Sequence, residues 1–460
     1  MSTPAPPSFE LTIERLSHGG RGVGRHEGIV VFVPNAAVGD RLKVKVKKKK
    51  RRHLEAEIEE VLVPGPGRQE APCPVFGRCG GCAWQHLAYG AQLEAKEAIV
   101  RDAFVHQAGI PDPPVAPILG SPEALHYRNK MEFAFDRDGT LGLHPRGFFH
   151  EVIEIEDCLL AGSFVADVLA VVRAYVKRLA LPGYDKKRHE GYLRHLVVRE
   201  GQGTGERLVA LVTEPGTLPE AEALVAALLE EVPGLQSVLH VENDSQSDVV
   251  AASAIHVLHG RDHIFETLAG HRYALYLPTF FQTNSGAAEV LVGRTVELAA
   301  LEGSETVLDV FCGVGAFSLP LARQAKQVWG VEIVPEAIEA AKKNAERAGL
   351  TNTSFHAGDA RRTLPLVLEE MGQPDLVLLD PPRSGAGGKV MRRLGRSRAP
   401  TILYVSCNPT TLAPDLKWLF GLGYRLESLQ PVDLFPQTWH VETIALLRLD
   451  PDAPIDESLL

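Results

Sequence analysis

The sequence predicts an α/β protein with three domains, and three observations lead to this fold class. Residues 284–460 alternate apolar strand segments with helical segments, a pattern typical of a parallel sheet covered by helices on both faces. Residues 1–66 contain several short strands with alternating apolar and polar positions, which a small OB-like β-barrel can accommodate. Residues 67–283 follow a Pro- and Gly-rich linker and mix extended with helical segments, so we expect a central domain of mixed α+β type.

The composition excludes several other classes of protein. The chain has 460 residues, of which 45% are hydrophobic and 23% charged, as in a soluble globular protein of several domains. No apolar run reaches the roughly 18 residues of a membrane span, and the N-terminal residues lack a signal-peptide pattern. Six cysteines are too few for a disulfide scaffold in a chain of this length. We therefore expect a cytoplasmic protein, monomeric and without a membrane partner.

The charge is distributed unevenly along the chain. The formal net charge is −10, but Arg41–Arg52 holds nine Lys or Arg residues and no acid, so the remainder carries −19. Such a run is often only a solvated face. On an OB-like barrel, however, nine cations can neutralise RNA phosphates, and the acidic total does not argue against an RNA partner.

The first strand of residues 284–460 is followed by a glycine loop. Gly313 and Gly315 let a nucleotide-like ligand approach the backbone at the carboxyl edge of the sheet, and Glu332 ends the next strand, where it can accept ribose hydroxyls. A nicotinamide-binding loop is the alternative, but Ser318 stands where that motif has its third glycine.

Two further acids follow the third and fourth strands. Asp359 and Asp380 stand where acids line the ligand crevice of a Rossmann-like sheet, and the series resembles the S-adenosylmethionine-dependent methyltransferases. An aromatic residue after Asp380-Pro-Pro would favour methylation of an amino group. Arg383 occupies that position, which weakens this alternative.

A cysteine and a glutamate are candidate catalytic residues. Cys407 ends a strand before an Asn-Pro turn, which would present its thiol as a nucleophile, although a lone cysteine is often a packing residue. Glu442 is the candidate base, and a solvated glutamate at a strand end is the alternative.

Five segments in order resemble the RNA uridine-C5 methyltransferase family, from the barrel to about Leu449. These segments are Phe280–Asn284, Leu308–Gly315, Asp380–Gly385, Ser406–Leu412 and Asp433–Glu442. The resemblance implies a Rossmann-like methyltransferase domain and an N-terminal TRAM domain that binds RNA. It implies Cys407 as nucleophile, Glu442 as base, and an S-adenosylmethionine site formed by Gln282, Phe311, Gly313, Ala316, Glu332, Asp359 and Asp380. Ala316 stands where relatives often have a polar residue.

Four other cysteines form a separate set. Cys73, Cys79 and Cys82 lie in a Pro- and Gly-rich loop, and Cys158 lies far downstream. Four thiolates can bind zinc or an iron–sulfur cluster, and spacing alone does not choose between them. The family resemblance implies a [4Fe-4S] cluster.

The reaction implied by the resemblance is methyl transfer from S-adenosylmethionine to C5 of a uridine, through a covalent bond between Cys407 and C6. A TRAM domain combined with the cysteine set implies 23S rRNA as the substrate. The same reaction on a tRNA uridine and a non-catalytic RNA-binding or assembly factor are the alternatives. A radical iron–sulfur enzyme would need a C-x3-C-x2-C motif, which this sequence lacks.

Overall fold

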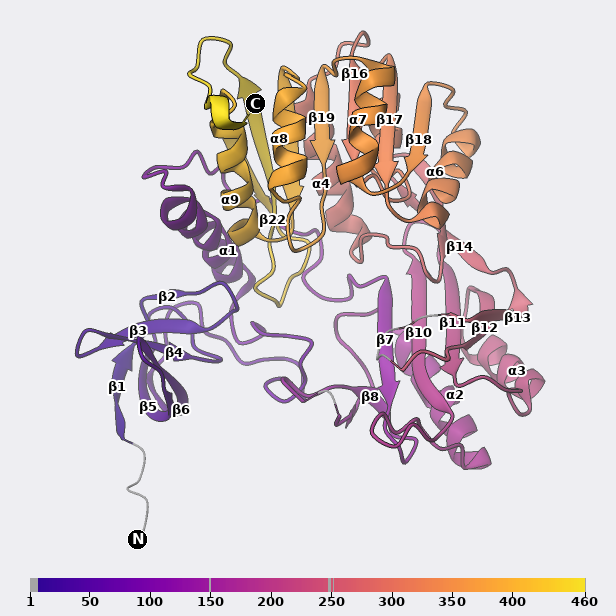
Figure 1. Cartoon of the computed structure of the whole chain (residues 1–460). Coiled ribbons are helices and arrows are strands. Elements are labelled where there is room, and N and C mark those ends of the chain that lie inside the picture. Colours follow the sequence, from indigo (N-terminus) through magenta and orange to yellow (C-terminus); the bar gives the residue numbers. More distant parts are fainter. Residues whose placement is uncertain (1–6, 149, 247–249, 251, 460) are drawn as a thin grey trace.

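The computed structural model describes residues 7–148, 150–246, 250 and 252–459 (Figure 1). Met1, at which the predicted first domain begins, and Leu460, at which the last one ends, lie outside the described residues. The chain forms a small N-terminal sheet, a central sheet with two helices and a C-terminal sheet flanked by helices, so the predicted α/β fold class is confirmed. None of the described helices combines the length and apolarity needed to cross a membrane.

The N-terminal sheet has six strands in the order β1-β5-β6-β4-β3-β2 and encloses its own apolar core. The alternation in β5 decides its orientation, because Leu42, Val44 and Val46 point into the core and the lysines between them face outward. The strands are β1 (Ser8–Thr12), β2 (Arg15–Leu16), β3 (Gly22–His26), β4 (Ile29–Val33), β5 (Arg41–Lys49) and β6 (His53–Val63).

The central sheet has seven strands in the order β13-β12-β11-β10-β7-β8-β9. It is mixed, since β11 and β12 are parallel and the other neighbours are antiparallel. Helices α2 and α3 pack on one face, and the hairpin of β14 and β15 shares a core with the other. The elements are β7 (Lys130–Phe135), β8 (Leu141–Leu143), β9 (Ile153–Glu154), α2 (Phe164–Leu179), β10 (Leu193–Gly201), β11 (Glu206–Thr213), α3 (Ala221–Glu231), β12 (Leu235–Glu242), β13 (Ala254–Gly260), β14 (His263–Leu268) and β15 (His271–Tyr276).

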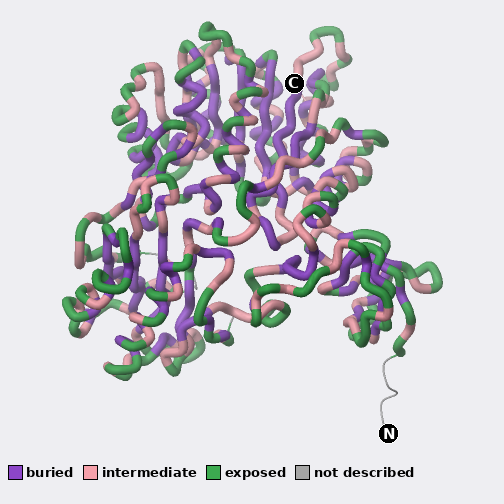
Figure 2. The backbone as a smooth tube through the Cα atoms, turned by 180° about the vertical axis from the view of Figure 1, so that it is seen from behind, coloured by how far each residue is buried: buried purple, intermediate pink, exposed green. Residues whose placement is uncertain are grey.

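The C-terminal sheet has seven strands in the order β18-β17-β16-β19-β20-β22-β21. Helices α4, α5 and α6 pack on one face, whereas α7, α8, α9 and the earlier helix α1 pack on the other. Figure 2 shows these strands as a buried layer between more exposed helices. The elements are α1 (Tyr89–Ala103), α4 (Ser285–Ala299), β16 (Thr306–Val310), α5 (Ser318–Ala322), β17 (Gln327–Glu332), α6 (Pro335–Arg347), β18 (Thr353–Ala357), α7 (Ala360–Met371), β19 (Leu376–Leu379), α8 (Gly388–Arg396), β20 (Thr401–Ser406), α9 (Pro409–Phe420), β21 (Tyr424–Val432) and β22 (Glu442–Leu449). A π-helical turn, Phe104–Ala108, extends α1, and a 3-10 turn, Glu457–Leu459, lies near the C-terminus.

Two features of this topology bring distant residues to one edge of the C-terminal sheet. The strand order reverses at β16, whose neighbours are β17 and β19, and a ligand crevice forms at the carboxyl ends of strands at such a switch point. Strand β22 runs antiparallel to β20, so β22 begins at the edge where β20 ends. The first residue of β22 therefore lies near the residues that follow the parallel strands.

Candidate functional site

Cys407 and Glu442 lie at this carboxyl edge on neighbouring strands. Cys407 follows β20 directly, and Asn408 caps the next helix by accepting a hydrogen bond from the Thr410 backbone N–H at 3.0 Å. Pro409 occupies the first turn of that helix, so the strand ends and the half-buried thiol stands at its tip. Glu442 opens β22 and is only 4% exposed.

The electrostatic environment couples these two groups. Burial raises the pKa of Glu442 to about 8, and the charge of Asp380 adds to this effect. Burial also raises the pKa of Cys407 to about 12, and the negative charge of Glu442 is the next cause. Arg383 opposes both shifts and is the cation that favours the thiolate and the carboxylate. Arg383 was not predicted as a site residue from the sequence, although it stands where an aromatic residue would favour methylation of an amino group.

A second buried acid, Asp309, was also missed. It lies in β16, is fully buried, and accepts a hydrogen bond from the Ser318 hydroxyl at 2.5 Å. Burial raises its pKa to about 7, and the charge of Glu332 contributes. The pKa of Asp380 is raised to about 7 by burial and by Asp309. The sequence signal for Asp309 is an acid inside an otherwise apolar strand segment. Its hydrogen-bond partner, Ser318, is the residue that stands in place of a third glycine.

The glycine loop after β16 closes against the end of β17. The backbone N–H of Phe311 donates to the Val331 carbonyl at 2.8 Å, and the backbone N–H of Gly313 donates to the Glu332 carboxylate at 3.3 Å. Gly315 has φ +88°, and an added Cβ would lie 2.6 Å from a Leu319 side-chain atom, so this position requires glycine. Phe311, Gly313 and Glu332 are thus brought together, as expected for one binding loop.

The remaining predicted ligand residues lie around the same domain. An added Cβ at Gly313 meets nothing within 4 Å, so the loop has open space, and Ala316 is half-buried beside it. Asp359 caps α7 and pairs with Arg361, which lowers the pKa of the carboxyl to about 2. Gln282 is buried before α4, and its carbonyl accepts a hydrogen bond from the Asn129 side chain at 2.8 Å. Neither Asp359 nor Gln282 hydrogen-bonds to another predicted site residue among the described residues.

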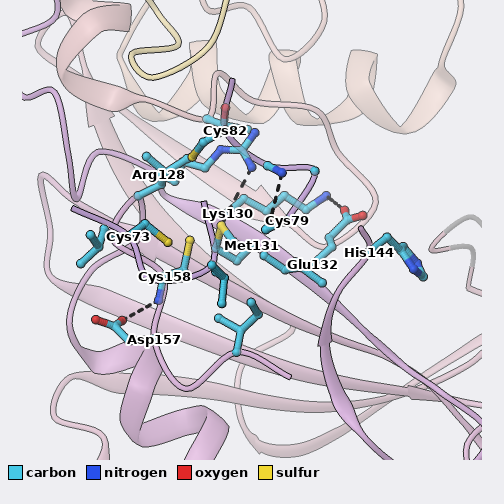
Figure 3. Close-up of a pocket in the computed structure, with 18 of the residues that line it drawn as sticks. Cys73, Cys79, Cys82, Arg128, Lys130, Met131, Glu132, His144, Asp157 and Cys158 are labelled. Carbon is cyan, nitrogen blue, oxygen red and sulfur yellow. Dashed lines mark hydrogen bonds and ion pairs between the residues drawn. The ribbon is translucent and has the colours of Figure 1, made fainter. Parts of the chain in front are cut away.

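Four of the other cysteines surround one cavity of about 560 Å³ (Figure 3). They are Cys73, Cys79, Cys82 and Cys158. Burial raises the pKa of Cys82 to about 12, and the charges of the other three thiols add to this effect. Within the described ranges, no three His, Cys, Asp or Glu side chains are arranged to hold a single metal ion.

The basic strip, the run Arg41–Arg52 that lies mostly on β5, is partly neutralised by acids of the neighbouring strand β6. Lys47 pairs with Glu57 at 2.6 Å, and Lys43 lies 3.7 Å from Glu59. These acids come from β6, which pairs with β5 along its length, so a count of charges along the sequence did not reveal them. Residues beyond the barrel also contact it, since the His18 and Trp439 rings lie 4.5 Å apart. Trp439 precedes Glu442 by three residues, so the barrel touches the segment that leads to the candidate base.

Comparisons with known proteins agree with this geometry. Residues 237–449 match the family described as tRNA (Uracil-5-)-methyltransferase, and residues 8–58 match the TRAM domain. An uncharacterized RNA methyltransferase of Halalkalibacterium halodurans is 38% identical, covering 96% of both chains. One from Caldanaerobacter subterraneus subsp. tengcongensis is 39% identical, covering 95% of this chain and 98% of the other.

A solved structure extends the similarity to three dimensions. It is the Pyrococcus abyssi tRNA (uracil-54, C5)-methyltransferase in complex with S-adenosyl-L-homocysteine. It is 30% identical to this chain, with a TM-score of 0.76, and the match covers 95% of this chain and 99% of that chain. The chain therefore belongs to the RNA uridine-C5 methyltransferase family and is an S-adenosylmethionine-dependent RNA methyltransferase with an N-terminal TRAM domain.

Proposed function

We propose that this enzyme methylates C5 of a uridine in large-subunit (23S) rRNA, with Cys407 as nucleophile and Glu442 as base. The observation that carries the catalytic assignment is the common location of these two side chains. They lie on the neighbouring strands β20 and β22 at the switch-point edge, and Arg383 acts on the pKa of both.

The chemistry needs a nucleophile because C5 of uridine is too electron-poor to attack a methyl sulfonium by itself. The Cys407 thiolate adds to C6, and the electron pair released into the ring makes C5 an enolate carbon. C5 attacks the methyl group, and the bond between methyl carbon and sulfur breaks to leave S-adenosylhomocysteine. Glu442 then removes the C5 proton, the bond between C6 and the Cys407 sulfur breaks, and 5-methyluridine is released.

The charges around these groups have separate roles. Burial raises the pKa of both Cys407 and Glu442 and so favours their protonated forms, whereas each group acts as an anion in this mechanism. Arg383 lowers the pKa of both and stabilises the anionic forms. The target nucleotide must leave any stacked or paired position, because Cys407 has to reach C6 and the methyl group has to reach C5.

Seven residues form the proposed S-adenosylmethionine site. Glu332 would accept the ribose hydroxyls, and the open space at Gly313 admits the nucleoside to the backbone. Asp359 and Asp380 would contact the adenine and methionine portions, and Gln282, Phe311 and Ala316 complete the site. Asp359 must share its carboxylate with Arg361 to do so.

A [4Fe-4S] cluster held by Cys73, Cys79, Cys82 and Cys158 completes the proposal. Tetrahedral zinc, with Zn–S bonds of about 2.3 Å, would need sulfurs about 3.8 Å apart. A cluster instead binds each thiolate at a separate iron, so its ligands lie farther apart. Four cysteines around one cavity supply the four thiolates that a [4Fe-4S] cluster requires. The methyl transfer has no redox step, so the cluster would be structural.

The second candidate substrate is a tRNA uridine. It is favoured by the P. abyssi enzyme, which aligns with 95% of this chain and is named for tRNA uracil-54. The barrel and the cysteine set support rRNA through family resemblance alone. Mapping 5-methyluridine by mass spectrometry in rRNA and tRNA from a deletion strain separates the two, because only the true substrate loses its methyl group.

The catalytic assignment is tested with labelled S-adenosylmethionine and unmodified RNA. Cys407→Ala should abolish methylation, whereas Glu442→Gln should slow turnover and accumulate an RNA–protein adduct that survives denaturing gel electrophoresis. Lys343→Ala, a charge change at an exposed position on α6, is the matched control and should retain wild-type turnover. Appreciable turnover by Cys407→Ala would exclude the covalent route.

A further inference from the structure

A groove between α7 and α8 is lined almost entirely by cations, none of which has a role in the site described above, although its single acid, Asp359, belongs to the proposed S-adenosylmethionine site. Its volume is about 430 Å³, and six basic side chains and one acid line it. The lining residues are Asp359, Arg361, Arg362, Lys389, Arg392, Arg393 and Arg396. The single acid is already paired with Arg361, so the groove carries a strong positive charge.

Three of these cations stand where helices normally avoid them. Arg361 and Arg362 lie in the first turn of α7, and Lys389 lies in the first turn of α8, and neither turn contains an acid. The positive end of a helix dipole repels cations, and carboxylates are the residues that stabilise it. The Asp359 carboxylate caps α7 and offsets this repulsion there, whereas α8 begins after Gly387 without a side-chain cap. The three cations add positive potential to the same surface, as an anion-binding surface requires.

The basic side chains of the groove differ in whether they contact other residues of the protein. Arg392 lies over the Trp418 ring at 4.9 Å, and Arg396 donates to the Leu459 carbonyl at 2.9 Å. The side chains of Arg362 and Lys389 are exposed and form no hydrogen bond or ion pair with any described residue. These two are therefore free to take an external anion.

The groove lies between two helices that begin at the carboxyl edge of the C-terminal sheet. Helix α7 follows β18, and the segment that begins at Asp380 and includes Arg383 joins β19 to α8. Cys407 follows β20 at the same edge, so the first turns of α7 and α8 lie on the side of the sheet at which the target base would bind. The occupant that fits is a polyanion with regularly spaced phosphates.

We propose that this α7–α8 groove binds phosphates of the substrate RNA beside the target nucleotide, as a contact surface separate from the TRAM domain. The proposal rests on RNA being the substrate, and not on the catalytic assignment. Binding measurements therefore separate its failure from a failure of Cys407 or Glu442 to act as described.

The first test compares the salt dependence of RNA binding. The double variant Arg362→Ala/Lys389→Ala is titrated with a fluorescent single-stranded RNA long enough to span the catalytic domain, beside Lys326→Ala/Lys343→Ala. The control pair removes the same charge at exposed positions outside the groove, before β17 and on α6. Loss of two phosphate contacts should reduce the slope of log K against log salt by about 1.4 and weaken binding about 20-fold at 0.1 M salt.

The second test uses the wild-type protein and measures how RNA changes the rate of lysine acetylation. Acetylation of Lys389 by an amine-reactive ester should slow when the RNA is bound, whereas acetylation of Lys326 should not change. The proposal is overturned if the groove variant keeps the wild-type slope, if both variants lose slope equally, or if RNA leaves Lys389 unprotected.

Discussion

Replacement of Lys96 by Met should destabilise the protein strongly. Lys96 on α1 and Asp433, in the segment before Glu442, are both fully buried, and their charged atoms lie 2.5 Å apart. Lys96 also donates to the Phe435 carbonyl at 3.0 Å. Burial lowers the pKa of Lys96 and Asp433 opposes this shift, so the pair depends on both partners.

The magnitude follows from what the substitution leaves behind. Met fills similar space but leaves the Asp433 carboxylate buried without its cation, and breaking a buried pair in this way costs about 3–5 kcal/mol. One carboxylate oxygen still accepts the Phe435 backbone N–H at 3.0 Å, but the other has no partner among the described atoms. With a urea m-value of about 3 kcal/mol/M, the unfolding midpoint should fall by about 1–1.7 M.

The assay is urea unfolding followed by circular dichroism, with a double variant as control. Adding Asp433→Asn to Lys96→Met removes the unpaired charge and should recover a large part of the lost stability. A loss below about 1 kcal/mol for Lys96→Met, or a double variant no more stable than the single one, would refute the reasoning.

Three further predictions concern the carboxyl edge of the sheet. Arg383→Ala should raise the pKa of both Cys407 and Glu442, so alkylation of Cys407 by iodoacetamide at pH 9 should slow about tenfold, whereas Arg383→Lys should retain much of the rate. Glu442→Gln should stabilise the protein by up to about 5 kcal/mol at pH 9 and change little at pH 4. The pKa of Glu442 in the folded protein, about 8, exceeds the ordinary value of 4.5, so the stability of the wild type falls as the pH rises between these values. A difference in unfolding midpoint between the variant and the wild type that is the same at pH 9 and pH 4 would contradict this prediction. Ser318→Ala removes the hydrogen bond to buried Asp309 and should cost about 1–3 kcal/mol above pH 8, where the carboxyl is ionised, and less at pH 5, which thermal unfolding at the two pH values checks.

The parts of the fold that depend on local pattern could be predicted from the sequence. Alternation in Arg41–Lys49 indicated a half-exposed strand, and continuous apolar segments such as Leu376–Leu379 indicated a buried parallel sheet. The mixed central sheet could be predicted only as a class, because its order depends on pairings between distant segments, such as β10 with β7 and β11.

The candidate site shows the same contrast between features that depend on local sequence and contacts between distant segments. The location of residues at strand ends, such as Cys407 and Glu332, could be predicted because the carboxyl ends of parallel strands share one edge. The Lys96–Asp433 pair joins residues 337 positions apart, and no periodic pattern marks it. The partial neutralisation of the basic strip by Glu57 and Glu59 likewise depends on strand pairing. Arg383 acts through proximity to two groups that only the folded sheet brings together.

The most direct test of the central claim is mass spectrometry of the adduct formed by Glu442→Gln with RNA and S-adenosylmethionine. After digestion with trypsin and nuclease, we expect one modified peptide, with a 5-methylated dihydrouridine nucleotide joined through C6 to the sulfur of Cys407. The absence of an adduct, or an adduct on a residue other than Cys407, would contradict the account.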